Sequence, residues 1–150
     1  MFGRRRQAPV PAPQVSPLTA GEVEWRDRRL ELAAVLAEAY TGDASAPPTL
    51  ATLDALVAGW LADDHGIDVN TLVNAVGVAF GEHVARGTGL QWVIVTDEHG
   101  SDLALHGQPG DVLVHPANAV ARRVVERQAP FVAALHDELV QGVARARSGR

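Results

Sequence analysis

The chain has 150 residues, a formal net charge of −5 and no cysteine. The lack of cysteine excludes disulfide bridges, thiolate catalysis and cysteine-ligated metal centres, and the 13 basic residues include no lysine, which excludes lysine chemistry. No apolar run approaches the roughly 18 residues that a membrane helix requires, so no association with a membrane is expected.

Charge is unevenly distributed along the chain. Residues 20–144 hold 7 arginines and all 18 acidic residues, a formal charge of −11. A domain that binds nucleic acid needs clustered cations on its folded surface. We therefore expect no binding of nucleic acid by the folded domain, and attraction to a basic protein partner.

Residues 1–19 are predicted to be a disordered tail rich in arginine and proline. Four prolines remove backbone donors and favour extended conformers, so neither helix nor sheet is expected there. The three arginines at residues 4–6 are not followed by the apolar segment of an export signal, which favours a cytoplasmic location. Residues 20–147 are expected to form a single α+β domain.

Three helices are predicted next from apolar residues at helical spacing. The first covers residues 21–40, the second starts at a Thr49 cap and stops at His65-Gly66, and the third runs from an Asp68 cap to residues 87–89. The residues expected to face inward in the first helix are Trp25, Leu32, Val35, Leu36 and Ala39; in the second, Leu50, Leu53, Leu56, Val57, Trp60 and Leu61; in the third, Leu72, Val73, Val76, Phe80 and Val84.

Two glycines interrupt the third helix. Gly77 and Gly81 each cost about 1 kcal/mol relative to alanine in a helix interior. Close approach of another backbone would offset that cost. The alternative is a ligand cleft with Glu82 and His83 at its rim.

Residues 91–115 predict an antiparallel meander of three strands. We expect a three-residue loop at residues 98–100 with Gly100 in the left-handed conformation, which places Val95 opposite Leu103 and Val93 opposite Leu105. The opposite, mixed face then carries Trp92, Ile94, Thr96, Asp102, Ala104 and His106. A Pro109-Gly110 turn leads into the third strand at residues 111–115.

Two further helices complete the predicted fold. One starts at Pro116 and is supported by an Arg122/Glu126 pair four residues apart. The other follows Pro130 and turns four apolar residues inward, namely Val132, Leu135, Leu139 and Val143. The fold class is α+β: three N-terminal helices, a three-stranded antiparallel meander and two C-terminal helices packed on the sheet.

Residues 70–145 carry a motif pattern of a glycine–glutamate helix, Trp-x-x-Val-x-Asp-x-x-Gly, an Ala-Leu strand, and a proline before a helix with a basic residue. In this pattern the chain resembles the DUF3806 family, small bacterial domains of unknown function. The matching positions are Gly81, Glu82, Trp92, Asp97, Gly100, Ala104, Leu105, Pro116 and Arg123. The resemblance implies a fold and assigns no chemistry.

No constellation of residues predicts a reaction. The six histidines lack the spacing of a metal motif, although helical His83 and His136 remain free to converge with another one. Glu82, Asp97 and Asp102 would serve as paired carboxylates only if they were held close together, and Asp97 and Asp102 flank a turn that favours aspartate locally. No nucleophile or phosphate-loop motif is present, and no cofactor or metal is expected.

Six positions are the candidate functional residues: Glu82, His83, Trp92, Asp97, Asp102 and Arg123. Trp92 is expected either to cover the core or to form an exposed platform for a partner. Arg123 is a candidate partner of Asp97 or Glu82 in a buried ion pair.

The leading functional hypothesis is a non-enzymatic, acidic module of the accessory or immunity type that binds a protein. One competing hypothesis is a small hydrolase or metal-dependent enzyme that uses Glu82 and His83 in a helix–sheet cleft. The other is a homo-oligomeric structural domain that uses the mixed face of the sheet as its interface.

Overall fold

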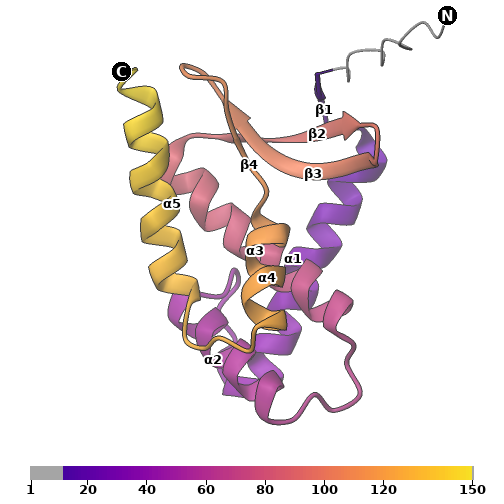
Figure 1. Ribbon diagram of the computed structural model, residues 1–150. Coiled ribbons are helices and arrows are strands. Elements are labelled where there is room, and N and C mark those ends of the chain that lie inside the picture. The colour runs from indigo at the N-terminus through magenta and orange to yellow at the C-terminus, as the bar shows by residue number, and fades with distance from the viewer. Residues whose placement is uncertain (1–11, 150) are drawn as a thin grey trace, which may run out of the picture.

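The computed structural model describes residues 12–149, in which a four-stranded antiparallel sheet lies across one end of a group of helices (Figure 1). The strands are hydrogen-bonded in the order β1-β2-β3-β4. The elements in chain order are β1 (Gln14–Pro17), α1 (Ala20–Thr41), α2 (Leu50–Ala62), α3 (Val69–Thr88), β2 (Gln91–Asp97), β3 (Gly100–Gly107), β4 (Val112–Val114), α4 (Pro116–Val125) and α5 (Val132–Arg147).

Capping residues confirm the predicted starts of α2 and α3 and the predicted end of α3, whereas α2 ends at Ala62, before the predicted stop at His65-Gly66. The side chains of Thr49 and Asp68 accept hydrogen bonds from backbone N–H groups at the starts of α2 and α3. Gly89 ends α3 in the left-handed conformation, with φ of 76°, and Pro116 occupies the first turn of α4. The prediction of five helices, three before the meander and two after it, is correct.

Strand β1 corrects the prediction that neither helix nor sheet forms before residue 20. Gln14–Pro17 pairs antiparallel with β2, with Val15 opposite Val95. Because β1 is an edge strand, the missing N–H of Pro17 is tolerated. The rest of the predicted tail, up to residue 11, lies outside the described residues.

The register of the β2–β3 hairpin differs by one residue from the prediction. Asp97 pairs with Gly100, so the loop has two residues, and Trp92 lies opposite Leu105. The positive φ expected at Gly100 is observed, at 125°. Because cross-strand partners share a face, Trp92 and Leu105 project to the same side, and the predicted separation into an apolar and a mixed face is wrong.

The hydrophobic core lies among the helices and beneath the sheet. The inward stripes predicted for α2, α3 and α5 all belong to this core or pack against it. The stripe predicted for α1 is partly wrong, because Val35 is 61% exposed, and Trp25 and Ala39 are also exposed. Ala33, Leu36 and Ala37 are the buried residues of α1, so small residues bring this helix close to the core.

Close packing explains the two glycines of α3. A Cβ atom on Gly77 would lie 2.7 Å from Cα of Ala117 in α4, and one on Gly81 would lie 2.6 Å from Cζ2 of Trp92. The prediction that another backbone approaches is confirmed at Gly77. At Gly81 the approaching group is the indole ring of Trp92.

The C-terminal helices are anchored by contacts distant in sequence. Asp54 of α2 accepts three backbone N–H groups at the start of α5, from Phe131, Val132 and Ala133, at 2.8, 2.6 and 3.0 Å. Such a carboxylate satisfies donors that the first turn of a helix leaves free. The predicted Arg122/Glu126 ion pair is not formed; Glu126 instead accepts a hydrogen bond from the Gln128 side chain.

None of the helices within residues 12–149 combines the length and the apolar composition needed to cross a membrane.

Candidate binding pocket

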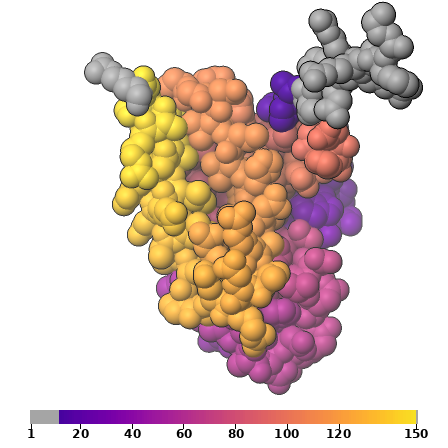
Figure 2. Space-filling view, in the orientation of Figure 1, coloured from indigo at the N-terminus to yellow at the C-terminus, as the bar shows by residue number. Residues whose placement is uncertain are grey.

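A pocket of about 110 Å³ lies between α1, α3, α4 and the sheet. At this point β4 leaves the sheet and continues directly into α4, which lies on the face of the molecule drawn in Figure 2. The pocket is lined by residues from every surrounding element, namely Trp25, Asn74, Gly77, Val78, Trp92, Asp102, Leu103, His115, Ala117 and Asn118.

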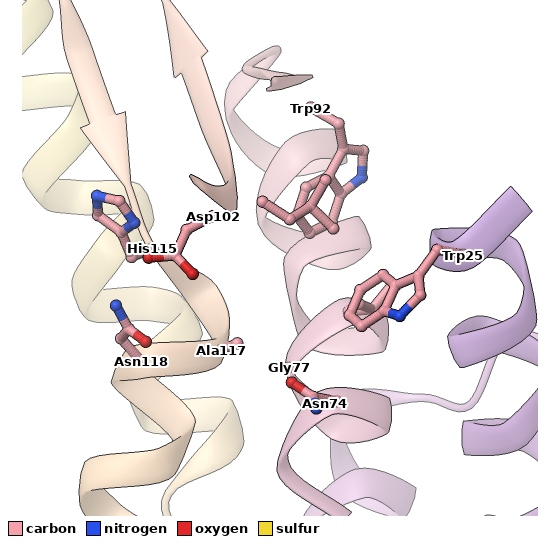
Figure 3. A pocket seen from close by; sticks show the side chains of 10 residues that line it. Trp25, Asn74, Gly77, Trp92, Asp102, His115, Ala117 and Asn118 are labelled. Atoms are coloured by element: carbon pink, nitrogen blue, oxygen red, sulfur yellow. The ribbon is translucent and has the colours of Figure 1, made fainter. Parts of the chain in front are cut away.

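Two indole rings form one side of the pocket, which we call the aromatic wall (Trp25 and Trp92; Figure 3). Trp92 is held in place because its Nε1–H donates to Oε1 of Glu82 at 2.7 Å and its ring packs on Gly81. Trp25 is 37% exposed and lies under the guanidinium of Arg29, whose Cζ is 4.5 Å from the ring centroid. The aromatic wall is therefore rigid at Trp92 and open to the surface at Trp25.

Polar side chains form the opposite side, which we call the polar wall (Asp102, His115 and Asn118; Figure 3). Asp102 is exposed, and its carboxylate forms no hydrogen bond or ion pair within residues 12–149. The Nδ1 atom of His115 is buried and has no hydrogen-bond partner. A buried polar atom without a partner costs free energy. Because this nitrogen is solvent-inaccessible, it does not itself border the open space of the pocket.

Carboxylates dominate the charge of this surface. A second hollow adjoins the pocket and shares Trp25, Asn74, Asp102 and Leu103 with it. It adds Glu22. Neither hollow is lined by an arginine, although the Arg29 guanidinium lies over the ring of Trp25, which lines both. The combined surface favours a cation over an anion.

The structure brings three of the six candidate residues together. Trp92 and Asp102 line the pocket on opposite sides, and Glu82 lies behind Trp92 as the acceptor of its indole N–H. Trp92 is thus neither a plain core residue nor a fully exposed platform. It is a half-buried ring that borders a cavity.

The other three candidates lie elsewhere. His83 Nε2 is 2.7 Å from the carbonyl oxygen of Pro48, Asp97 accepts from the backbone N–H of His99 at 2.7 Å, and Arg123 donates to the Ala119 carbonyl at 3.1 Å. The local turn role predicted for Asp97 is confirmed. The suggested ion pair of Arg123 with Asp97 or Glu82 is wrong.

Glu82 and His83 do not share a cleft, because they bond to different elements. His83 instead meets His136 of α5, with 6.5 Å between the ring centroids. Within residues 12–149 no three histidine or acidic side chains are grouped so that they could hold a metal ion.

Sequence reasoning missed four polar or aromatic residues of the pocket: Trp25, Asn74, His115 and Asn118. The sequence predicts Trp25 as a core residue and offers His115 only as one of six possible metal ligands. No local signal marks the two asparagines, since their role depends on how α3 and α4 pack. The close contact predicted from Gly77 is the one feature that indicated where these helices meet.

A family model for a domain of unknown function (DUF3806) matches residues 51–135. The match begins earlier and ends earlier than the predicted range of residues 70–145, and it contains every pocket residue except Trp25. No curated protein and no solved structure matches the chain. The match covers more than half of the sequence, and the chain belongs to the DUF3806 family.

Proposed function

We propose that this protein is a non-enzymatic module that binds a positively charged segment of a partner protein at the pocket between the aromatic and polar walls. The observation that carries the proposal is a pocket lined by two indole rings and by Asp102, an exposed residue whose carboxylate forms no hydrogen bond or ion pair within residues 12–149. Aromatic residues in a pocket beside a charged group are typical of the energetic centre of a protein interface.

The charge of the chain supports a basic partner. Residues 20–144 carry a formal charge of −11 from 7 arginines and 18 acidic residues, so a cationic protein is steered toward the domain. The pocket then supplies a specific contact at the end of that encounter.

The enzyme hypothesis has less support. General acid–base chemistry requires titratable groups that reach a common substrate. Glu82 is bonded to Trp92, and His83 is bonded to the Pro48 carbonyl, so neither side chain is directed at a shared space.

The oligomer hypothesis also has less support. Among residues 12–149, the large exposed apolar side chains are Val15, Trp25, Val35, Val69 and Val125, which lie on four different elements. A homodimer interface needs a contiguous apolar patch.

The proposal is tested by affinity capture from a native lysate with three baits: the wild-type protein, Asp102→Arg and Asp137→Arg. The Asp137 side chain is 75% exposed on α5, outside the pocket, so its reversal changes the net charge equally. We expect a basic protein that is retained by the wild type and by Asp137→Arg, released by salt, and lost with Asp102→Arg.

Equal retention by all three baits would contradict the proposed site. Elemental analysis of the same sample provides a second check, because a stoichiometric transition metal would favour the enzyme hypothesis.

A further inference from the structure

We infer that the pocket recognises the guanidinium group of an arginine side chain on the partner. This inference rests on the proposed function and specifies the chemistry of the group that enters the site.

The pocket has room for a small head group. Its volume is about 110 Å³, and the adjoining hollow of about 270 Å³ shares Trp25, Asn74, Asp102 and Leu103 with it. A head group of a few heavy atoms fills the pocket, and the rest of the ligand lies in the hollow or outside. The pocket is accessible from the surface because Trp25 and Asp102 are both exposed.

Two groups of the polar wall can accept hydrogen bonds from a ligand that donates. They are the Asp102 carboxylate and the amide oxygen of Asn118. Guanidinium carries five N–H donors and no acceptor. An anion is disfavoured because Asp102 and Glu22 line the adjoining surfaces.

The aromatic wall selects guanidinium over ammonium. A planar, weakly hydrated guanidinium stacks on an indole face while its edge donates to a carboxylate, whereas the lysine ammonium is a compact and strongly hydrated charge. The molecule already contains such a stack, because Arg29 lies over Trp25. Trp92 offers a second indole on the same wall, fixed by its hydrogen bond to Glu82.

The test uses the three indole N–H signals in two-dimensional ¹H–¹⁵N NMR spectra of the full chain. Trp25 and Trp92 line the pocket, and Trp60, whose Nε1–H donates to the Ile67 carbonyl at 2.9 Å, is an internal control outside it. The probes are N-acetyl-arginine amide and N-acetyl-lysine amide, added in equal steps at constant ionic strength.

We expect the arginine probe to shift the Trp25 and Trp92 signals saturably and to leave Trp60 unchanged. The lysine probe should bind about tenfold more weakly, since each tenfold step corresponds to about 1.4 kcal/mol, less than the worth of one charge-assisted hydrogen bond. Asp102→Asn should weaken the arginine probe by at least about the same factor. Glu98→Gln removes the same charge at the hairpin tip, outside the pocket, and should leave the affinity unchanged.

Equal shifts with both probes, no saturable shift, or an unchanged affinity in Asp102→Asn would overturn the inference. Its failure is distinguishable from that of the proposed function. A partner captured through Asp102 together with equal binding of both probes leaves the function standing and removes the arginine preference. Selective binding of the arginine probe with no captured partner leaves the arginine preference standing and removes the proposed function.

Discussion

At the scale of single residues, Asp54 is the side chain with the largest structural role that sequence reasoning did not identify. Its carboxylate joins α2 to the start of α5 through three backbone N–H groups. Asp54→Ala should lower the free energy of unfolding by about 2 kcal/mol, since the donors of the first turn lose their acceptor. Urea unfolding followed by circular dichroism measures this change.

A matched control for Asp54→Ala is Glu38→Ala, at an exposed position of α1. Its effect should stay within about 0.5 kcal/mol, as expected for a surface substitution. Equal effects of the two substitutions would show that Asp54 does not hold the two helices together.

Asp43 gives the protein a stability that depends on pH. Hydrogen bonds from the Ser45 side chain, the Thr52 hydroxyl and the Ser45 N–H lower the pKa of Asp43 from 3.8 to about 2. A carboxyl group with a lowered pKa stabilises the folded state above its unfolded pKa, and this contribution is lost as the pH falls from about 4 to about 2.

Asp43→Asn should therefore be less stable than the wild type above pH 5, and the difference should narrow as the pH falls through that window. Ser45→Ala should share part of the effect, because it removes the hydroxyl donor. Unfolding curves at a series of pH values measure the difference, and parallel pH dependences of the wild type and Asp43→Asn would contradict the assignment.

At the scale of elements, the glycines of α3 set how closely α4 and the sheet approach. Gly77→Ala should lower the free energy of unfolding by about 1–3 kcal/mol. The added methyl group contacts the Ala117 backbone, so one of the two helices must shift to make room for it. Gly142→Ala in α5 is the matched control, since a Cβ there meets nothing within 4 Å.

The control should raise stability by up to about 1 kcal/mol, the helix propensity gained by replacing glycine. Opposite signs for the two substitutions are the expected outcome in denaturant unfolding. If Gly77→Ala raised the free energy of unfolding, α3 and α4 would not be in close contact at this position.

The sequence predicts elements well where one local signal decides them. Caps at Thr49 and Asp68 and the left-handed Gly89 mark helix ends because they satisfy backbone groups within a few residues. The predicted register of the β2–β3 hairpin is wrong because loops of two and three residues suit the same turn sequence. A shift of one residue exchanges the two faces of a strand. Strand β1 is missed because prolines are compatible with an edge strand.

At the scale of the whole molecule, the pocket arises from packing that no local pattern encodes. Trp25, Trp92, Asp102 and His115 come from four segments that meet only when the helices and the sheet are assembled. The acidic balance of residues 20–144 agrees with the presence of Asp102 and Glu22 at the pocket and its adjoining hollow. The sequence thus predicts the charge of this surface but not the residues that assemble it.

The most direct measurement is a crystal structure of the protein with N-acetyl-arginine amide. We expect a guanidinium between the walls, stacked on the indole of Trp92 and donating to the Asp102 carboxylate. A pocket that holds only solvent while the probe occupies another acidic surface would contradict it.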